Sequence, residues 1–209
     1  MKNVPSITRR RIGLCAGILI LLGLAAMRLC ALGQPAVPEI ALMIGEPYED
    51  MRKRSTADID PAIPGHTFFN IPKSDARLRV IDPIYGFVTP AARYFMVGFD
   101  EERVSTISLS PQIEPLLLDD ALRIMLDLLD LQEQWRRGGW KPIWPEREPP
   151  FADTPEWRTQ LRDARQGTTY WQAGDKYQLL LSVRRFRDDK HPDEERYLIT
   201  LDIAKPWLQ

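Results

Sequence analysis

The chain has 209 residues, with 28 basic and 29 acidic side chains and a formal net charge of −1. Five basic and no acidic residues lie in residues 1–33, so the remainder carries 23 basic against 29 acidic residues, a net charge of −6. This balance argues against nucleic acid or an anionic bilayer surface as the main partner. Both cysteines also lie in residues 1–33, which excludes disulfides and thiolate metal sites from the rest of the chain.

The first 33 residues predict a membrane segment. Residues 1–11 form a basic cytoplasmic tail ahead of the uncharged apolar run Ile12–Met27. This order of charge and apolar residues delivers everything after it to the far side of the membrane. If Arg28 reaches the interface, residues 12–33 supply the length of about 20 residues that a spanning helix needs. We therefore expect an uncleaved signal-anchor in the inner membrane and a domain in the periplasm, with cleavage after Ala31-Leu32-Gly33 as the alternative.

The linker is placed at residues 34–40, and residues 41–209 are expected to form one periplasmic domain with its own core. A short helix is expected to begin at Gly45-Glu46-Pro47, because proline suits the first turn of a helix and acidic residues suit its N-terminal dipole. The prolines between Asp60 and Thr89 favour turns and strand ends. The strands expected in this half are Glu39–Ile44, Thr67–Ile71, Arg77–Ile81, Ile84–Val88, and a hairpin of Arg93–Phe99 with Arg103–Leu109.

The clearest helix is predicted for Glu114–Arg137, with Pro115 in its first turn and Gly138-Gly139 after its last. One narrow polar stripe recurs every three or four residues and comprises Asp119, Arg123, Asp127, Asp130, Gln134 and Arg137. The remaining apolar arc is wider than a surface helix needs. It predicts a helix in the crease of a curved sheet, or a helix that shares part of this arc with a partner.

The second half is predicted to contain a loop, a helix and a three-stranded meander. The loop is Gly138–Phe151, and the helix begins at Asp153-Thr-Pro-Glu156, which is similar to a capping box, and ends before Gly167. The meander strands are Thr168–Ala173, Lys176–Phe186 and Tyr197–Ile203. This order predicts an α+β domain with an antiparallel sheet and helices packed on one face. The opening helix of Ile44–Met51 and the later hairpin with its acidic turn resemble small envelope modules of the BamE-like or β-lactamase-inhibitor-like kind, at the level of fold only.

The sequence contains no recognisable catalytic, cofactor-binding or metal-binding motif. His66 and His191 both lie in loop contexts and are not spaced as ligands, and the common nucleophile, phosphate-binding and dinucleotide-binding patterns are missing. We therefore expect no enzyme, no cofactor and no metal. Carboxylates are grouped at Asp100 to Glu102 and at Asp188-Asp189. Two carboxylates about 5–10 Å apart can hydrolyse a glycosidic bond, so an envelope hydrolase remains an alternative.

The loop Gly138–Phe151 combines tryptophans with several prolines. Tryptophan is enriched at binding hot spots, and a proline-stiffened loop loses little entropy on binding. We therefore predict that Trp140 and Trp144 bind a protein partner, with Arg147 and Glu148 at a polar rim. The alternative is that the tryptophan rings fix the loop to the domain's own core.

Three stretches resemble immunity proteins encoded beside type VI secretion effectors of Gram-negative bacteria. They are Ile63–Lys73, Asp82–Pro90 and Ser110–Asp120. The resemblance implies a membrane-anchored periplasmic protein that neutralises a toxin or effector by direct contact, and it carries over no contact residues. A structural or assembly subunit of an envelope complex is the alternative binding role.

Overall fold

The computed structural model describes residues 36–208 apart from 64, 67, 71 and 165, and Val37–Gln209 form one compact unit. The predicted signal-anchor therefore lies outside the described residues. Within the described range, no helix has the length and apolar character needed to cross a membrane. This range contains three helices and two sheets, so the prediction of an α+β domain is confirmed.

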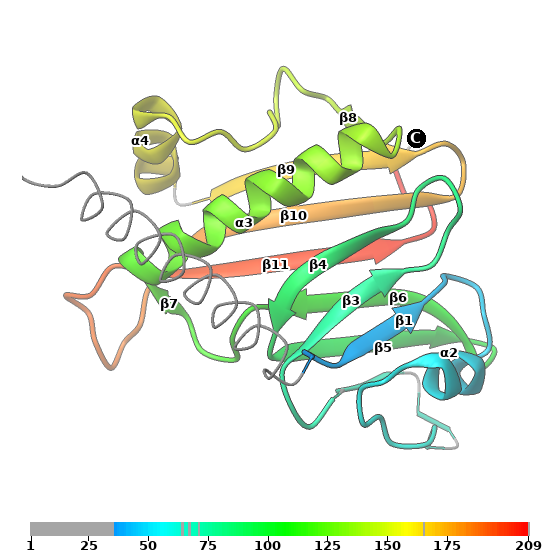
Figure 1. The fold of residues 1–209 in the computed structure, drawn as a ribbon. Coiled ribbons are helices and arrows are strands. Elements are labelled where there is room, and N and C mark those ends of the chain that lie inside the picture. Colours follow the sequence, from blue (N-terminus) through cyan, green and yellow to red (C-terminus); the bar gives the residue numbers. More distant parts are fainter. Residues whose placement is uncertain (1–35, 64, 67, 71, 165, 209) are drawn as a thin grey trace, which may run out of the picture. The chain divides into compact units, whose positions relative to one another are not determined.

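The elements follow the chain in a mixed order, from the blue N-terminal strand to the red C-terminal strand of Figure 1. The strands are β1 (Glu39–Leu42), β2 (Phe68–Asn70), β3 (Ala76–Val80), β4 (Phe87–Ala92), β5 (Tyr94–Asp100), β6 (Arg103–Ser110), β7 (Leu116–Leu117), β8 (Lys141–Ile143), β9 (Gln166–Ala173), β10 (Tyr177–Phe186) and β11 (Arg196–Ala204). The helices are α2 (Tyr48–Arg54), α3 (Leu118–Arg137) and α4 (Pro155–Ala164).

Eight strands form a large antiparallel sheet in the order β2-β5-β6-β11-β10-β9-β8, with β7 paired to β11. A separate small sheet has the order β1-β3-β4. In the small sheet β1 is parallel to β3, and β3 is antiparallel to β4. The expectation of a single antiparallel sheet missed this small sheet. The long connection through α2 gives the chain room to return parallel to β1, as a parallel pair requires.

One face of the large sheet is covered, and the core lies beneath that cover. The helix α3 lies along β9, β10 and β11, and the small sheet lies beside it (Figure 1). Buried side chains of α3 such as Leu128 and Leu131 line the same small apolar space as Leu181 of β10 and Leu201 of β11. The prediction that this helix lies in the crease of a sheet therefore agrees with its packing.

Side chains satisfy the outer edge of β1, which would otherwise present free backbone groups. The backbone amides of Glu39 and Ala41 donate to the hydroxyls of Thr56 and Ser55, at 2.8 and 3.0 Å. The amide of Met43 donates to the Glu46 carboxylate at 2.6 Å. The short α2 and the turn that follows it thereby protect the edge against pairing with another chain.

Several predicted boundaries need correction. The long helix begins at Leu118 and not at Glu114, because Leu116 and Leu117 stay extended to pair with Tyr197 and Arg196 of β11. The strand expected at Ile84–Val88 runs instead over Phe87–Ala92, since the preceding residues turn around the Asp82 carboxylate. The segment Gly138–Phe151 is not all loop, because β8 forms the edge of the large sheet.

Candidate protein-binding site

Of the four residues predicted to bind a partner, Trp140 lies in the core. Its side chain is 3% exposed, and its ring contacts the rings of Tyr85, Phe87 and Tyr177 at centroid distances of 5.7–6.2 Å. Its Nε1 donates a hydrogen bond of 3.0 Å to the backbone oxygen of Tyr85. Trp140 therefore fixes the loop to the core, as in the alternative to partner binding, and its burial removes it from direct contact with a partner.

The other three predicted residues form an exposed turn, which we call the Trp144 turn (residues 144–148). The Trp144 side chain is 44% exposed, and its ring meets the ring of Tyr170 edge to face at 6.0 Å. The backbone amides of Arg147 and Glu148 both donate to the Trp144 oxygen at 2.9 Å. The Glu148 carboxylate accepts a hydrogen bond from the hydroxyl of Thr168 on β9. These bonds hold the turn at the edge of the large sheet with the indole ring accessible.

Trp144 also adopts a backbone conformation that residues other than glycine seldom take. Its φ angle is +52°, in the left-handed region. Such a conformation costs of order 1–3 kcal/mol for a bulky residue and persists only where the surroundings fix it. The residue with this unfavourable backbone conformation is therefore also the one that carries the exposed ring of the Trp144 turn.

The second face of the large sheet, here called the open face, carries the side chains that alternate with the core residues. Its middle is a row that crosses six strands, here called the central row. The strand registers place its members side by side in the order Met96, Ser108, Asp202, Leu180, Tyr170 and Ile143. All six side chains are half-buried. Because Trp144 packs on Tyr170, the Trp144 turn continues this row at one end.

The open face is poor in charge around the central row. Its neighbouring side chains on the three middle strands are Thr106, Ser110, Thr200, Ala204, Gln178 and Ser182. The side-chain amide of Gln178 is buried and bonds the backbone of Trp207 and Leu208, so the C-terminal residues cover that part of the face. The basic side chains Arg184 and Arg196 lie further along the strands, toward the loop that joins β10 to β11. A solvated face of an antiparallel sheet is ordinarily polar, whereas interface centres are depleted in charge and enriched in tyrosine, tryptophan and methionine. The composition of the open face matches the interface pattern.

Asp202 is the carboxylate in the middle of the central row. It accepts a hydrogen bond from the hydroxyl of Ser108 on the neighbouring strand. Burial raises the pKa of Asp202 above its usual value, against the opposing effects of the Ser108 hydrogen bond and the positive charge of Arg184. Partial burial of a carboxylate that only one hydroxyl and a distant charge support costs folding free energy. Burial of the ionised Asp202 carboxylate therefore opposes folding in part.

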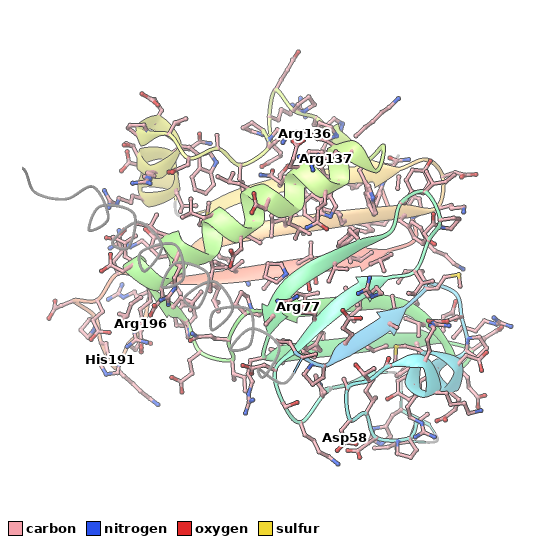
Figure 2. All side chains as sticks on the ribbon, viewed as in Figure 1. Asp58, Arg77, Arg136, Arg137, His191 and Arg196 are labelled. Carbon is pink, nitrogen blue, oxygen red and sulfur yellow. The ribbon has the colours of Figure 1, made fainter. Side chains whose placement is uncertain are left out.

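Exposed apolar side chains border the far end of the open face. The registers place Phe186 of β10 and Leu117 of β7 on either side of Arg196 of β11. Phe186 and Leu117 are 38% and 46% exposed. The Arg196 guanidinium bonds the Glu194 carboxylate and the backbone oxygen of Pro115. Figure 2 shows Arg196 and His191 at this end of the sheet, away from Arg136 and Arg137 at the end of α3.

The contacts of the histidines and of the carboxylates near them indicate structural roles. His191 Nδ1 lies 3.0 Å from an Asp188 oxygen in the exposed loop before β11. That contact with His191, together with a backbone bond from Lys190, holds the pKa of Asp188 below its usual value. His66 lines a pocket beside α2. Among the described residues, no three histidine, cysteine or carboxylate side chains gather in a way that could hold a metal ion.

Asp82 is the most fully satisfied carboxylate of the domain. One of its oxygens accepts the amides of Ile84 and Tyr85, both at 2.9 Å. The other lies 3.2 Å from Lys176 Nζ and accepts the Tyr177 hydroxyl at 3.1 Å. Burial alone would raise the pKa of Asp82, but these hydrogen bonds outweigh it and hold the pKa below its usual value. Asp82 thus joins the β3–β4 turn to the start of β10, which is a structural role.

The residues of the Trp144 turn were predicted from the sequence to bind a partner, and this stays a prediction, whereas the open face was not predicted. The signal was present in β11, where Leu198, Thr200 and Asp202 alternate with buried residues. The central row joins residues from six strands, and its members become neighbours only through strand order and register. No local pattern in one strand predicts that order.

Comparisons of the chain with protein-family models, with curated proteins and with solved structures give no match.

Proposed function

We propose that this chain is a protein-binding module that grips its partner with the open face and the Trp144 turn. The central row is the observation that carries this proposal. Its side chains are half-exposed, mostly apolar and continuous across the sheet, with one carboxylate in the middle. A partner would bury the apolar members and donate a hydrogen bond or a positive charge to Asp202, while Trp144 supplies an aromatic anchor at the edge.

The same proposal places the module at a membrane. The basic tail and apolar run of residues 1–33 support a single-pass anchor in the inner membrane, with the domain in the periplasm. The acidic charge of the remaining chain agrees with a protein partner better than with nucleic acid. Fractionation with N-terminal sequencing tests this part, since a soluble product that begins at or near Gln34 would contradict the tether.

The role that fits a tethered binding module best is neutralisation of a toxin or effector in the periplasm, as in immunity proteins. It is supported by the resemblance of three sequence stretches and by an exposed surface with interface composition. A structural subunit of an envelope complex remains the second candidate, because such a subunit also binds proteins through an open sheet face. A hydrolase has no observation that favours it over these two.

The test is a pull-down of tagged full-length protein from a solubilised envelope fraction, with Trp144→Ala as the interface variant and Lys190→Ala as a surface control. Truncation of a hot-spot tryptophan costs about 2 kcal/mol or more of binding free energy, or about thirtyfold in affinity. We expect one toxin-like partner that the Trp144 variant loses and the control keeps. A stable complex of several subunits would favour the envelope role, and equal recovery by both variants would remove the Trp144 turn from the interface.

A further inference from the structure

A short segment after β11 lies against part of the open face, and we call it the β11 tail (Lys205–Leu208). Its backbone bonds the side chain of Gln178 on β10. In Figure 1 it is the red segment that runs from the end of β11 past β10. The strand register pairs Gln178 with Ala204, and the next pair on the same face is Leu180 with Asp202. The β11 tail therefore adjoins the central row.

The side chain of Gln178 is fully buried, and its amide group uses its whole hydrogen-bonding capacity. Its Oε1 accepts the backbone amides of Trp207 and Leu208 at 2.9 and 2.8 Å. Its Nε2 donates to the backbone oxygen of Leu208 at 2.9 Å and to the side-chain oxygen of Gln172 at 3.1 Å. A buried amide that loses such partners costs folding free energy. Three of the four hydrogen bonds of Gln178 therefore depend on the β11 tail.

These bonds involve only backbone atoms of the β11 tail. Every polypeptide segment offers the same N–H and C=O groups, except where proline removes the N–H. Gln178 therefore does not select for the side chains of Trp207 and Leu208. Backbone hydrogen bonds also supply much of the affinity when a sheet protein binds a peptide from another chain. The chemistry of the site thus suits a backbone segment of another protein as well as the β11 tail.

Apart from these bonds, the β11 tail buries little of its own surface. Lys205 is exposed, Trp207 is 44% exposed, and Pro206 and Leu208 are half-buried. In β11 itself, by contrast, alternate side chains are at most 2% exposed. Segments with few buried apolar contacts open at a small free-energy cost compared with the core. The β11 tail can therefore leave Gln178 while the sheet stays folded.

We propose that the β11 tail is an exchangeable cover of the open face, and that a backbone segment of the bound partner replaces it on Gln178. This inference rests on the proposed function, because a partner held at the central row and at Trp144 brings its own chain close to Gln178. A tethered segment has an effective concentration of about millimolar order. The held partner therefore competes with the β11 tail on a similar scale, whereas a free peptide must reach about millimolar concentration. The exchange adds Gln178 and Ala204 to the contact surface.

The experiment titrates isotopically labelled full-length protein, in a nonionic detergent, with the unlabelled peptide acetyl-Lys-Pro-Trp-Leu-amide, which has the sequence of the β11 tail. The control peptide carries N-methyl-leucine, which keeps the side chains and removes the backbone donor that corresponds to Leu208. We expect the first peptide, at about millimolar concentration, to shift the NMR signal of the Lys205 amide as the tail is displaced. The control peptide should leave that signal unchanged. An absence of shifts, or equal shifts with both peptides, would overturn the proposal.

Two variants separate the backbone of the β11 tail from its side chains. Leu208→Pro removes one backbone donor, whereas the matched control Trp207→Ala removes an exposed side chain and keeps every backbone bond. We expect Leu208→Pro to need about fivefold less peptide for half-saturation of the Gln178 side-chain signals, because its own tail competes less. Trp207→Ala should match the wild type. Equal midpoints for Leu208→Pro and the wild type would overturn the proposal, and so would an equal decrease in both variants.

These titrations do not involve Trp144, the central row or the partner, so their failure is distinct from failure of the proposed function. A tail that no peptide displaces would limit the partner to the central row and the Trp144 turn. If Asp202→Asn instead leaves partner affinity unchanged, the proposed function fails at the central row. Peptide exchange on Gln178 would then still be measured, but the partner's place on Gln178 would be overturned.

Discussion

The two faces of the large sheet are built by the same strands but differ in what their side chains do. Along β11, Tyr197, Ile199, Leu201 and Ile203 are buried under α3 and the small sheet, and the residues between them are half-exposed. Burial on the covered face supplies the apolar contacts that stabilise the fold. The central row of the open face is not covered in this way, and its side chains are half-buried. The comparison therefore separates residues that hold the fold from residues that the proposed binding role would use.

The two tryptophans of the predicted binding loop give the largest expected contrast. Trp140→Ala should lower the free energy of unfolding by about 3–5 kcal/mol, because a fully buried ring and its hydrogen bond are lost. Trp144→Ala should change it by no more than about 1 kcal/mol, because the side chain is 44% exposed and its one ring contact within the described residues is with Tyr170. Denaturant unfolding of both variants measures the difference. Equal losses would show that Trp144 is part of the core, and the Trp144 turn would no longer be a binding element.

Adjacent leucines of β10 provide a contrast within one strand. Leu181 is fully buried on the covered face, whereas Leu180 belongs to the central row. Leu181→Ala should cost about 2–5 kcal/mol of stability through the cavity that it leaves. Leu180→Ala should cost no more than about 1 kcal/mol. If chemical denaturation gives a larger cost for Leu180, part of the chain covers the open face in solution and the surface is not available.

The pH dependence of stability tests the structural role of the Asp82 carboxylate. Asp82→Ala should cost about 1.5–3 kcal/mol near pH 7, because it removes hydrogen bonds made to a charged group. Since the folded-state pKa of Asp82 lies below its unfolded value, its contribution is present above the unfolded pKa and is lost as the pH falls through the folded pKa. Thermal melts of the wild type and the variant should therefore converge in acid. A gap that stays constant down to pH 2 would contradict a role for the ionised form.

Much of the fold could be predicted from the sequence because its signals are local. Alternating residues marked the hairpin of β5 and β6, and Thr154, which accepts the Trp157 amide at 3.2 Å, marked the start of α4. The boundaries failed where distant partners decide the conformation. Leu116 and Leu117 are good helix residues but pair with β11, and Lys141–Ile143 becomes a strand only because β9 offers an edge.

The candidate site was predictable only in part. Tryptophan and proline content drew attention to the loop Gly138–Phe151, but composition could not distinguish the buried Trp140 from the exposed Trp144, since burial depends on which rings lie opposite. The central row joins strands far apart in the chain. Its residue types are unremarkable one by one, so only the register of the strands brings out their combined chemistry.

Asp202→Asn tests the central claim most directly, because its expected effects on stability and binding have opposite signs. The raised folded-state pKa means that the carboxylate lowers stability at neutral pH, and this penalty disappears as the pH falls through the folded pKa toward the unfolded value. The variant should therefore melt at a temperature equal to or above that of the wild type at pH 7, and its advantage should shrink in acid.

The same variant should bind the partner from the pull-down about tenfold more weakly, because a hydrogen bond to a charged group is worth about 1.5–3 kcal/mol. Unfolding cannot mimic that combination. Melting and affinity measured on one preparation of full-length Asp202→Asn decide the matter. A higher or unchanged melting temperature with weakened binding supports the open face as the interface, and unchanged affinity would show that the partner binds elsewhere.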